Sequence, residues 1–164
     1  MELVDKFDNR RAPLNKVTER FEVIEGEYRQ SMHLWIMNDK GEFLIQKRSD
    51  NKKTNPGLWS ITGGGVEAGE RSYETVIREA KEELGVDINP DKVNFMLSIK
   101  RRHTFADVYL VMQNVNIDDV VMQEEEVSNV KWATVDEIKK LIDEGQFTSS
   151  IKIYLDMLLY LISE

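Results

Sequence analysis

Hydrophobic residues follow strand-like patterns through much of the chain. Two short apolar segments flank a turn signal at 38–41, which is typical of a β-hairpin. In the second segment, Phe43 and Ile45 would lie on one face and Leu44 and Gln46 on the other. The patterns predict an extended segment at 20–24 and strands at 32–37, 42–47, 58–62, 93–100, 108–113 and 127–133.

Three helices are predicted from helical periodicity and capping signals. The first covers 70–84, where apolar residues recur every three or four positions, and Gly85 is placed to cap its C-terminus. Thr134 and Glu137 have the spacing of a capping box, which opens a second helix ending near residue 144. The segment 151–162 is a final apolar helix. Strands first, one helix in the middle and helices at the end predict a mixed sheet sandwiched by helices.

Composition narrows the class of protein. The 164 residues suit one globular domain, with 1–27 as an N-terminal extension packed on it. The net charge of −8 disfavours sequence-independent binding to nucleic acid, which depends on Lys and Arg neutralising phosphates. The chain has no cysteine, which excludes disulfides, zinc–thiolate sites and a cysteine nucleophile. There is no apolar stretch of membrane-spanning length and no signal-peptide pattern, so we expect a cytoplasmic protein without a membrane partner.

Three glutamates in the first predicted helix are the strongest candidates for chemistry. Glu79, Glu82 and Glu83 stand at i, i+3 and i+4, and therefore lie on one helical face. Such helices are usually only solvated, and like charges this close repel one another. A hard divalent cation such as Mg²⁺ would offset that repulsion, because it prefers oxygen ligands.

Residues around these glutamates fit the same chemistry. Arg78 could reach back toward Glu70 or Glu74 as an internal cation. The run Gly63–Gly65 is expected to break the preceding strand and to let backbone approach a ligand, with a carbonyl completing a metal shell. A metal could neutralise diphosphate oxygens while a spare glutamate takes a proton from water. The segment therefore predicts a diphosphate site.

The whole segment resembles the Nudix box, Gly-x5-Glu-x7-Arg-Glu-U-x-Glu-Glu-x-Gly-U, where U is an apolar residue. The 23 residues from Gly64 to Val86 fill every specified position of that pattern. The matching residues are Gly64, Glu70, Arg78, Glu79, Ala80, Glu82, Glu83, Gly85 and Val86. The resemblance implies the Nudix α/β/α sandwich, an α/β (α+β) fold with a mixed β-sheet.

The resemblance also implies roles by position. Glu79 would be a metal ligand or the general base, and Arg78 would orient the glutamates by pairing with Glu70. The implied ligands of Mg²⁺ (or Mn²⁺) are the Gly63 carbonyl and the carboxylates of Glu79, Glu82 and Glu83. The implied reaction is Mg²⁺-dependent hydrolysis, by metal-activated water, of a diphosphate bond in a nucleoside diphosphate linked to another moiety.

The N-terminal half is similar to the Nudix branch that contains isopentenyl-diphosphate isomerase. The similarity lies in Lys40-Gly41, Arg48, Lys52-Lys53 and Pro56-Gly57-x-Trp59. That isomerase uses a cysteine in the glycine-rich turn and histidines as metal ligands. This chain has Gly63 in place of the cysteine, and Arg29 and Gly65 at two histidine positions, so isomerase chemistry is disfavoured.

Several residues outside the box are weaker candidates for binding substrate. Lys47 and Arg48 end a strand beside a loop, and Arg102 belongs to a short basic run; all three could contact phosphate. A further carboxylate could come from Glu126 or, behind it, Asp107. The substrate itself is not readable, and the two rival functions are a non-catalytic nucleotide sensor and an isomerase. A homodimer is a further expectation, because Nudix proteins often dimerise.

Overall fold

The computed structural model describes residues 2–164. An N-terminal hairpin consists of β1 (Leu3–Phe7) and β2 (Pro13–Glu19). The main sheet contains β3 (Arg29–Met37), β4 (Phe43–Arg48), β5 (Trp59–Ser60), β6 (Thr62–Gly65), β7 (Val93–Lys100), β8 (Thr104–Met112) and β9 (Val127–Ala133). The helices are α1 (Ser72–Leu84), α2 (Val135–Asp143) and α3 (Leu155–Ser163), with short 3-10 helices at Pro90–Lys92, Ile117–Asp119 and Ser149–Ile151. Within residues 2–164, no helix combines the length and apolar character needed to cross a membrane.

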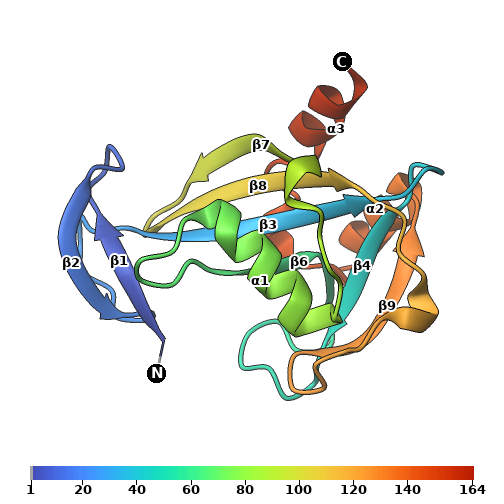
Figure 1. Cartoon of the computed structure of the whole chain (residues 1–164), viewed down its shortest axis with the longest axis horizontal. Helices are drawn as coiled ribbons and strands as arrows, with labels where there is room; N and C mark the ends of the chain where they lie inside the picture. The colour runs from blue at the N-terminus through green and yellow to red at the C-terminus, as the bar shows by residue number, and fades with distance from the viewer. Residues whose placement is uncertain (1) are drawn as a thin grey trace.

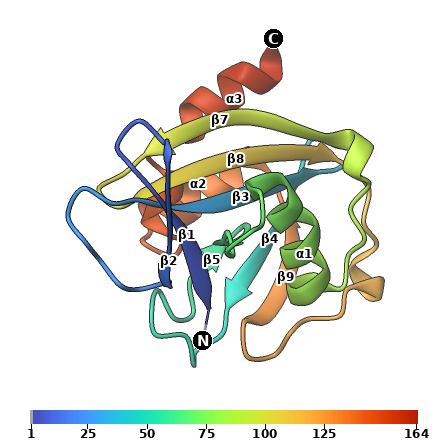
Figure 2. The ribbon, with the colours of Figure 1, turned by 60° about the vertical axis from the view of Figure 1, so that its left-hand side comes forward.

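The main sheet is mixed, with β3 at its centre. β3 pairs in parallel with β8 and antiparallel with β6, and β4 pairs antiparallel with β5 and β9. Helix α1 lies over one face, while α2 and α3 lie on the other (Figures 1 and 2). The expected helix–sheet–helix sandwich with a mixed sheet is therefore confirmed.

Alternation along the strands creates two apolar layers, one on each face of the sheet. Trp35, Phe43 and Ile45 belong to the layer under α2 and α3, together with Ile138 and Leu158. On the other face, a layer under α1 contains Met32, Leu34, Leu44, Val76 and Ala80. The predicted split of β4 between two faces is therefore correct, and it turns Gln46 toward α1.

Three sequence-based expectations about elements are wrong. Residues 20–24 form turns and loop, because the preceding strand ends at Glu19. The run Gly63–Gly65 does not break a strand but forms most of β6, paired with β3 in the register Gly63↔His33. The last helix begins at Leu155 instead of 151, after a 3-10 turn. The N-terminal hairpin had no alternating apolar signal strong enough to predict it.

The hairpin packs beside the sandwich, at the left of Figure 1. Backbone hydrogen bonds join Phe7 N to Tyr28 O at 2.8 Å and Ala68 N to Leu3 O at 2.8 Å. The amide of Gly69 donates to the Asp5 carboxylate at 2.8 Å. These contacts bring the start of β1 against the loop that leads into α1.

Candidate functional site

Helix α1 is fixed at both ends and along its buried face. Ser72 Oγ bonds to Asp107 Oδ2 and to the Tyr109 hydroxyl, both at 2.6 Å, which anchors the first turn to β8. Val76 and Ala80 are fully buried against the sheet. Gly85 ends the helix with φ of 64°, a left-handed conformation that glycine adopts without strain, so the predicted C-cap is confirmed.

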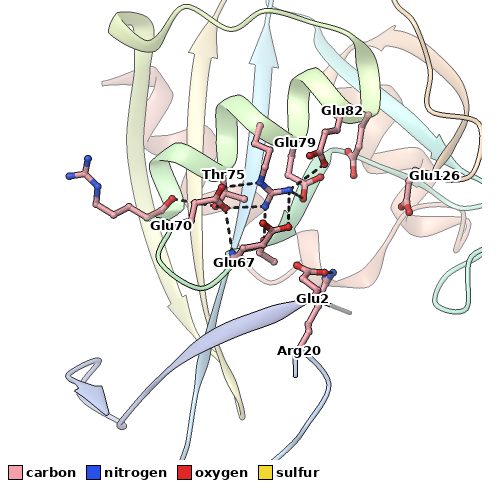
Figure 3. A network of polar contacts seen from close by, with 12 residues as sticks. Glu2, Arg20, Glu67, Glu70, Thr75, Glu79, Glu82 and Glu126 are labelled. Atoms are coloured by element: carbon pink, nitrogen blue, oxygen red, sulfur yellow. Dashed lines mark hydrogen bonds and ion pairs between the residues drawn. The ribbon is translucent and has the colours of Figure 1, made fainter. Parts of the chain in front are cut away.

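The glutamates of α1 gather on the side of the helix next to β6, near the glycine strand (Figure 3). Arg78 Nη1 donates to Glu79 at 3.0 Å and to Glu82 at 3.3 Å. Glu83 is only 7% exposed, and it accepts a hydrogen bond from Gln46 Nε2 at 3.0 Å. Gln46 in turn accepts one from Thr62 Oγ1 at 3.0 Å, so β4 and β6 together orient Glu83.

Arg78 pairs with Glu70 and leaves Glu74 to another partner. Its Nε and Nη2 donate to the two Glu70 oxygens at 2.9 and 3.0 Å, and Nη2 also donates to the Gly65 carbonyl at 3.2 Å. Glu74 instead bonds Arg71 at 3.1 Å. Burial raises the pKa of Glu70, but the hydrogen bonds from Arg78 and Thr75 outweigh it, and the pKa lies below its ordinary value. Glu70 therefore stays ionised, and its ion pair with Arg78 keeps that guanidinium beside Glu79 and Glu82.

Two of the carboxylates are placed where ionising both is unfavourable. Burial raises the pKa of Glu83, and the neighbouring Glu79 raises it further. Burial also raises the pKa of Glu79, against the opposing effect of Arg78. A cation between such groups would allow both to ionise. An all-oxygen, like-charged donor set of this kind fits a hard divalent cation.

The glycine strand lies directly against these carboxylates. A Cβ placed on Gly64 would overlap the carboxyl group of Glu79, and one on Gly63 would approach the Met32 carbonyl at 3.1 Å. The reason for glycine at position 64 is therefore the close approach of the Glu79 carboxyl group, and not an unusual backbone angle. Within residues 2–164, no three acidic or histidine side chains stand in an arrangement that would hold one metal ion, because Arg78 occupies Glu79 and Glu82.

The weaker candidates divide into two groups. Glu126 and Arg48 line the same cavity of about 430 Å³ as the glutamates. In it, Glu126 forms an ion pair with Lys52, and Arg48 bonds Thr54 O at 3.0 Å.

The other three lie away from the glutamates. Lys47 follows Gln46 on β4 and therefore faces the opposite side of the sheet. Arg102 lines a neighbouring cavity of about 380 Å³. Asp107 is buried and bonded to Arg11 Nη1 at 2.8 Å and to Ser72, so its oxygens are already engaged.

The structure adds residues that the sequence did not reveal. Gln46 orients Glu83, and its one available signal was a polar side chain on a predicted buried strand face. Arg20 and Arg29 line the cavity of the glutamates, and Glu2 bonds Arg20 at 3.0 Å. No local pattern marked Glu2 and Arg20, which lie at the two ends of the hairpin and reach the site only because the hairpin folds against the sandwich. Arg29 begins β3, and the sequence singled it out only as standing at a histidine position of the isomerase branch.

Comparison with known proteins places this geometry in a family. The model of the NUDIX domain matches residues 27–152. A Nudix hydrolase of Listeria innocua is 33% identical over 123 residues, covering 74% of this chain and 73% of that protein. The nucleoside triphosphatase NudI of Salmonella agona is 34% identical over 116 residues, covering 63% of this chain and 79% of that protein.

Solved structures agree on the fold. DR0079 of Deinococcus radiodurans superposes with a TM-score of 0.78 at 22% identity, covering 94% of this chain and 96% of that one. The MutT protein of Methanosarcina mazei superposes with a TM-score of 0.67 at 26% identity, covering 84% of this chain and 96% of that one. Because the superposition with DR0079 covers nearly all of both proteins, the likeness in fold extends over almost the whole chain.

Proposed function

The chain belongs to the Nudix hydrolase family, and on that premise we propose that it hydrolyses a diphosphate bond in a nucleotide derivative with the help of Mg²⁺ or Mn²⁺. The single observation that carries the proposal is the pairing of Glu79 with Glu83 beside the glycine strand. Two buried carboxylates this close repel each other when both are ionised, and a divalent cation beside them would offset that repulsion.

In the proposed reaction, water attacks one phosphorus of the diphosphate. A bond forms between the water oxygen and that phosphorus, the bond from phosphorus to the bridging oxygen breaks, and the second phosphate leaves. Glu79 would take the proton from water as general base, and its burial and raised pKa support this role. Its role as a ligand instead of a base stays an alternative.

The residues that would hold the metal are the Gly63 carbonyl, Glu82, Glu83 and, in the alternative in which it is not the base, Glu79. When bound, the ion would neutralise the diphosphate oxygens and lower the pKa of the attacking water. Arg78 would release Glu79 and Glu82 to the ion while staying fixed by Glu70 and the Gly65 carbonyl. Arg78 is thus a positioning residue that keeps the carboxylates in place.

We propose to test this with Glu82→Gln and Glu83→Gln. Purified protein with Mg²⁺ should release phosphate or a nucleoside monophosphate from a panel of nucleotide derivatives. Each substitution should lower turnover about a hundredfold or more, because it removes an anionic ligand of the metal. Glu74→Gln is the matched control on the same helix, since Glu74 bonds only Arg71 and should leave turnover unchanged. Full turnover in Glu82→Gln and Glu83→Gln would refute the site.

A non-catalytic nucleotide sensor is the rival function. It predicts that the protein binds a nucleotide in calorimetry and leaves it uncut over hours with Mg²⁺. The complete box favours the enzyme. Isomerase chemistry remains the least favoured reading, because Gly63 stands where that branch has a cysteine.

We also propose a substrate class and setting. One relative bears the name nucleoside triphosphatase, which supports a nucleotide as substrate. We further propose one domain over residues 1–164, no nucleic-acid or membrane partner, a cytoplasmic location and a possible homodimer. The likeness to the isopentenyl-diphosphate isomerase branch also stays a proposal, tested by the same substrate panel.

A further inference from the structure

A basic wall faces the glutamates across their cavity. Arg20, Phe21 and Arg29 line both that cavity and the adjoining one of about 380 Å³. The adjoining cavity adds further basic side chains, so that it is lined by Arg20, Arg29, Arg101 and Arg102, with His103 beside them. The chain as a whole carries a net charge of −8, so this cluster of basic side chains is a locally positive region on an acidic protein.

Arg29 in this wall has no partner among residues 2–164. Its Nη1 atom is buried and makes no hydrogen bond, and no carboxylate lies within 4.0 Å of its guanidinium. Burial lowers the pKa of Arg29, and the charge of Arg20 lowers it further. A buried donor left unbonded is costly, and a charged one more so. An anion in the cavity would accept the hydrogen bond that no group among residues 2–164 accepts from Arg29 Nη1.

The two arginines are held side by side by an aromatic ring. The Arg20 and Arg29 guanidiniums lie 5.0 and 6.0 Å from the centre of the Phe21 ring, which is 76% exposed at the cavity rim. Cation–π attraction partly offsets their mutual repulsion. Arg20 is also fixed by Glu2 at 3.0 Å, and its Nε is buried without a hydrogen bond.

Arg20 lies close to the reacting end of the site. A Cβ on Gly65 would meet Arg20 Nε at 3.1 Å and Glu2 Oε1 at 3.1 Å, so the guanidinium covers the last glycine of β6. The same Gly65 accepts a hydrogen bond from Arg78. Figure 3 shows Arg20 and Glu2 approaching Glu67, Glu79 and Glu82 from the hairpin side. A short anionic group in the cavity could therefore contact the arginines on one side and reach the glutamates on the other.

We propose that Arg20 and Arg29 bind a terminal phosphate of the substrate, on the wall of the cavity opposite the metal-binding glutamates. This rests on the proposed function and refines it. A phosphate monoester offers up to two negative charges and several acceptor oxygens, which suit two guanidiniums with unbonded donors. The preferred substrates are then nucleoside di- or triphosphates, in preference to diphosphates esterified at both ends. Because Arg20 and Phe21 lie before residue 27, the hairpin supplies selectivity from outside the matched family segment.

The first test measures binding without catalysis. In EDTA, titration of the full chain with inorganic phosphate should give saturable binding by calorimetry. Arg29→Gln and, separately, Arg20→Gln should weaken it by about tenfold, because each removes a charge-assisted donor. Arg10→Gln is the control, since Arg10 is exposed and pairs only with Asp8; binding should stay within about twofold. Unchanged binding in both cavity variants, or none in the unmodified chain, would overturn the proposal.

The second test separates a substrate phosphate from a free one. With Mg²⁺, KM for a nucleoside triphosphate should rise about tenfold in Arg29→Gln, while KM for a nucleoside diphosphate sugar should change by less than about twofold. An equal change for both substrates would refute recognition of a terminal phosphate, whether or not free phosphate binds. If Arg29→Gln proves poorly folded by circular dichroism, Arg20→Gln, in the turn that follows β2, gives the same comparison. Absence of all hydrolysis with intact phosphate binding would refute the proposed function instead.

Discussion

At the scale of single residues, the site depends on close approach between the glycine strand and side chains of α1. Gly64 and Glu79 are in direct contact, and Glu83 depends on one hydrogen bond from Gln46. On the far side of β3, Trp35 Nε1 donates to the Tyr154 hydroxyl at 2.9 Å, and that hydroxyl lies 2.8 Å from His33 Nδ1. Burial lowers the pKa of His33 to about 4, so the ring is neutral near pH 7.

Gly64→Ala should impair catalysis far more than folding. The added Cβ would displace the Glu79 carboxyl group, and a shift of about 1 Å in a catalytic group costs on the order of a hundredfold in turnover. The backbone angle is ordinary and Glu79 is flexible, so the free energy of unfolding should change by less than about 1 kcal/mol. Steady-state turnover and urea unfolding measure the two effects.

A double variant provides the control for Gly64→Ala. In a Glu79→Ala background the obstructed side chain is absent, so adding Gly64→Ala should cause little further loss. Strictly additive losses would show that the alanine acts through something other than Glu79.

His33 should make stability fall at acidic pH. Burial, and secondarily Arg101, lowers its pKa from 6.5 to about 4. Between pH 6.5 and pH 4, His33 is therefore protonated in the unfolded chain and neutral in the folded chain. The free energy of unfolding is unaffected by His33 above pH 6.5, and it falls as the pH falls from 6.5 toward 4. Relative to His33→Gln, the unmodified chain should lose about 3 kcal/mol of unfolding free energy across this interval. Urea unfolding of both proteins at several pH values measures the difference, and parallel pH profiles would contradict a neutral buried His33.

At the scale of elements, each helix has an end signal in the sequence and a buried face fixed by the sheet. α1 ends at Gly85, and α2 begins after Thr134, whose hydroxyl accepts from Glu137 N at 3.2 Å. Ile138 of α2 is 1% exposed in the layer that also contains Trp35. The cap and the buried side chain therefore stabilise the same helix by separate means.

Thr134→Ala should destabilise the protein by about 1 kcal/mol, because the amide of Glu137 loses its acceptor at the start of α2. Thr134→Ser keeps the hydroxyl and should lose much less. Midpoints of urea unfolding compare the two, and activity should be unchanged in both because α2 lies across the sheet from the glutamates. Equal destabilisation by Ala and Ser would exclude the cap as the cause.

At the scale of the whole molecule, the side chain of Arg11 adds a polar connection between the hairpin and the sandwich. This residue has φ of 67°, and its Nη2 donates to Gln30 at 2.6 Å while Nη1 donates to Asp107 at 2.8 Å. Asp107 also anchors the first turn of α1 through Ser72. One buried carboxylate thus connects the hairpin, the sheet and the catalytic helix.

Arg11→Met should cost about 2 kcal/mol of unfolding free energy, because it leaves the buried Asp107 without its cation. Adding Asp107→Asn should recover part of that loss, since the remaining group is then neutral. Calorimetric unfolding of the single and double variants measures both values. A double variant no more stable than Arg11→Met alone would show that the unpaired charge is not what destabilises the protein.

The sequence by itself determined the family, the mixed sheet under helices and the presence of three glutamates on one helical face. It could do so because strand alternation, helical spacing and capping are local properties, readable within a few residues. Tertiary structure alone decided that Gln46 orients Glu83, whereas the pairing of Arg78 with Glu70 had been implied by the resemblance to the Nudix box. Tertiary structure also brought Arg20 to the site, next to a hairpin that the sequence did not predict. These partners are far apart along the chain, as Gln46 and Glu83 are. The packing of the sheet brings them together, and no local pattern in the sequence could show it.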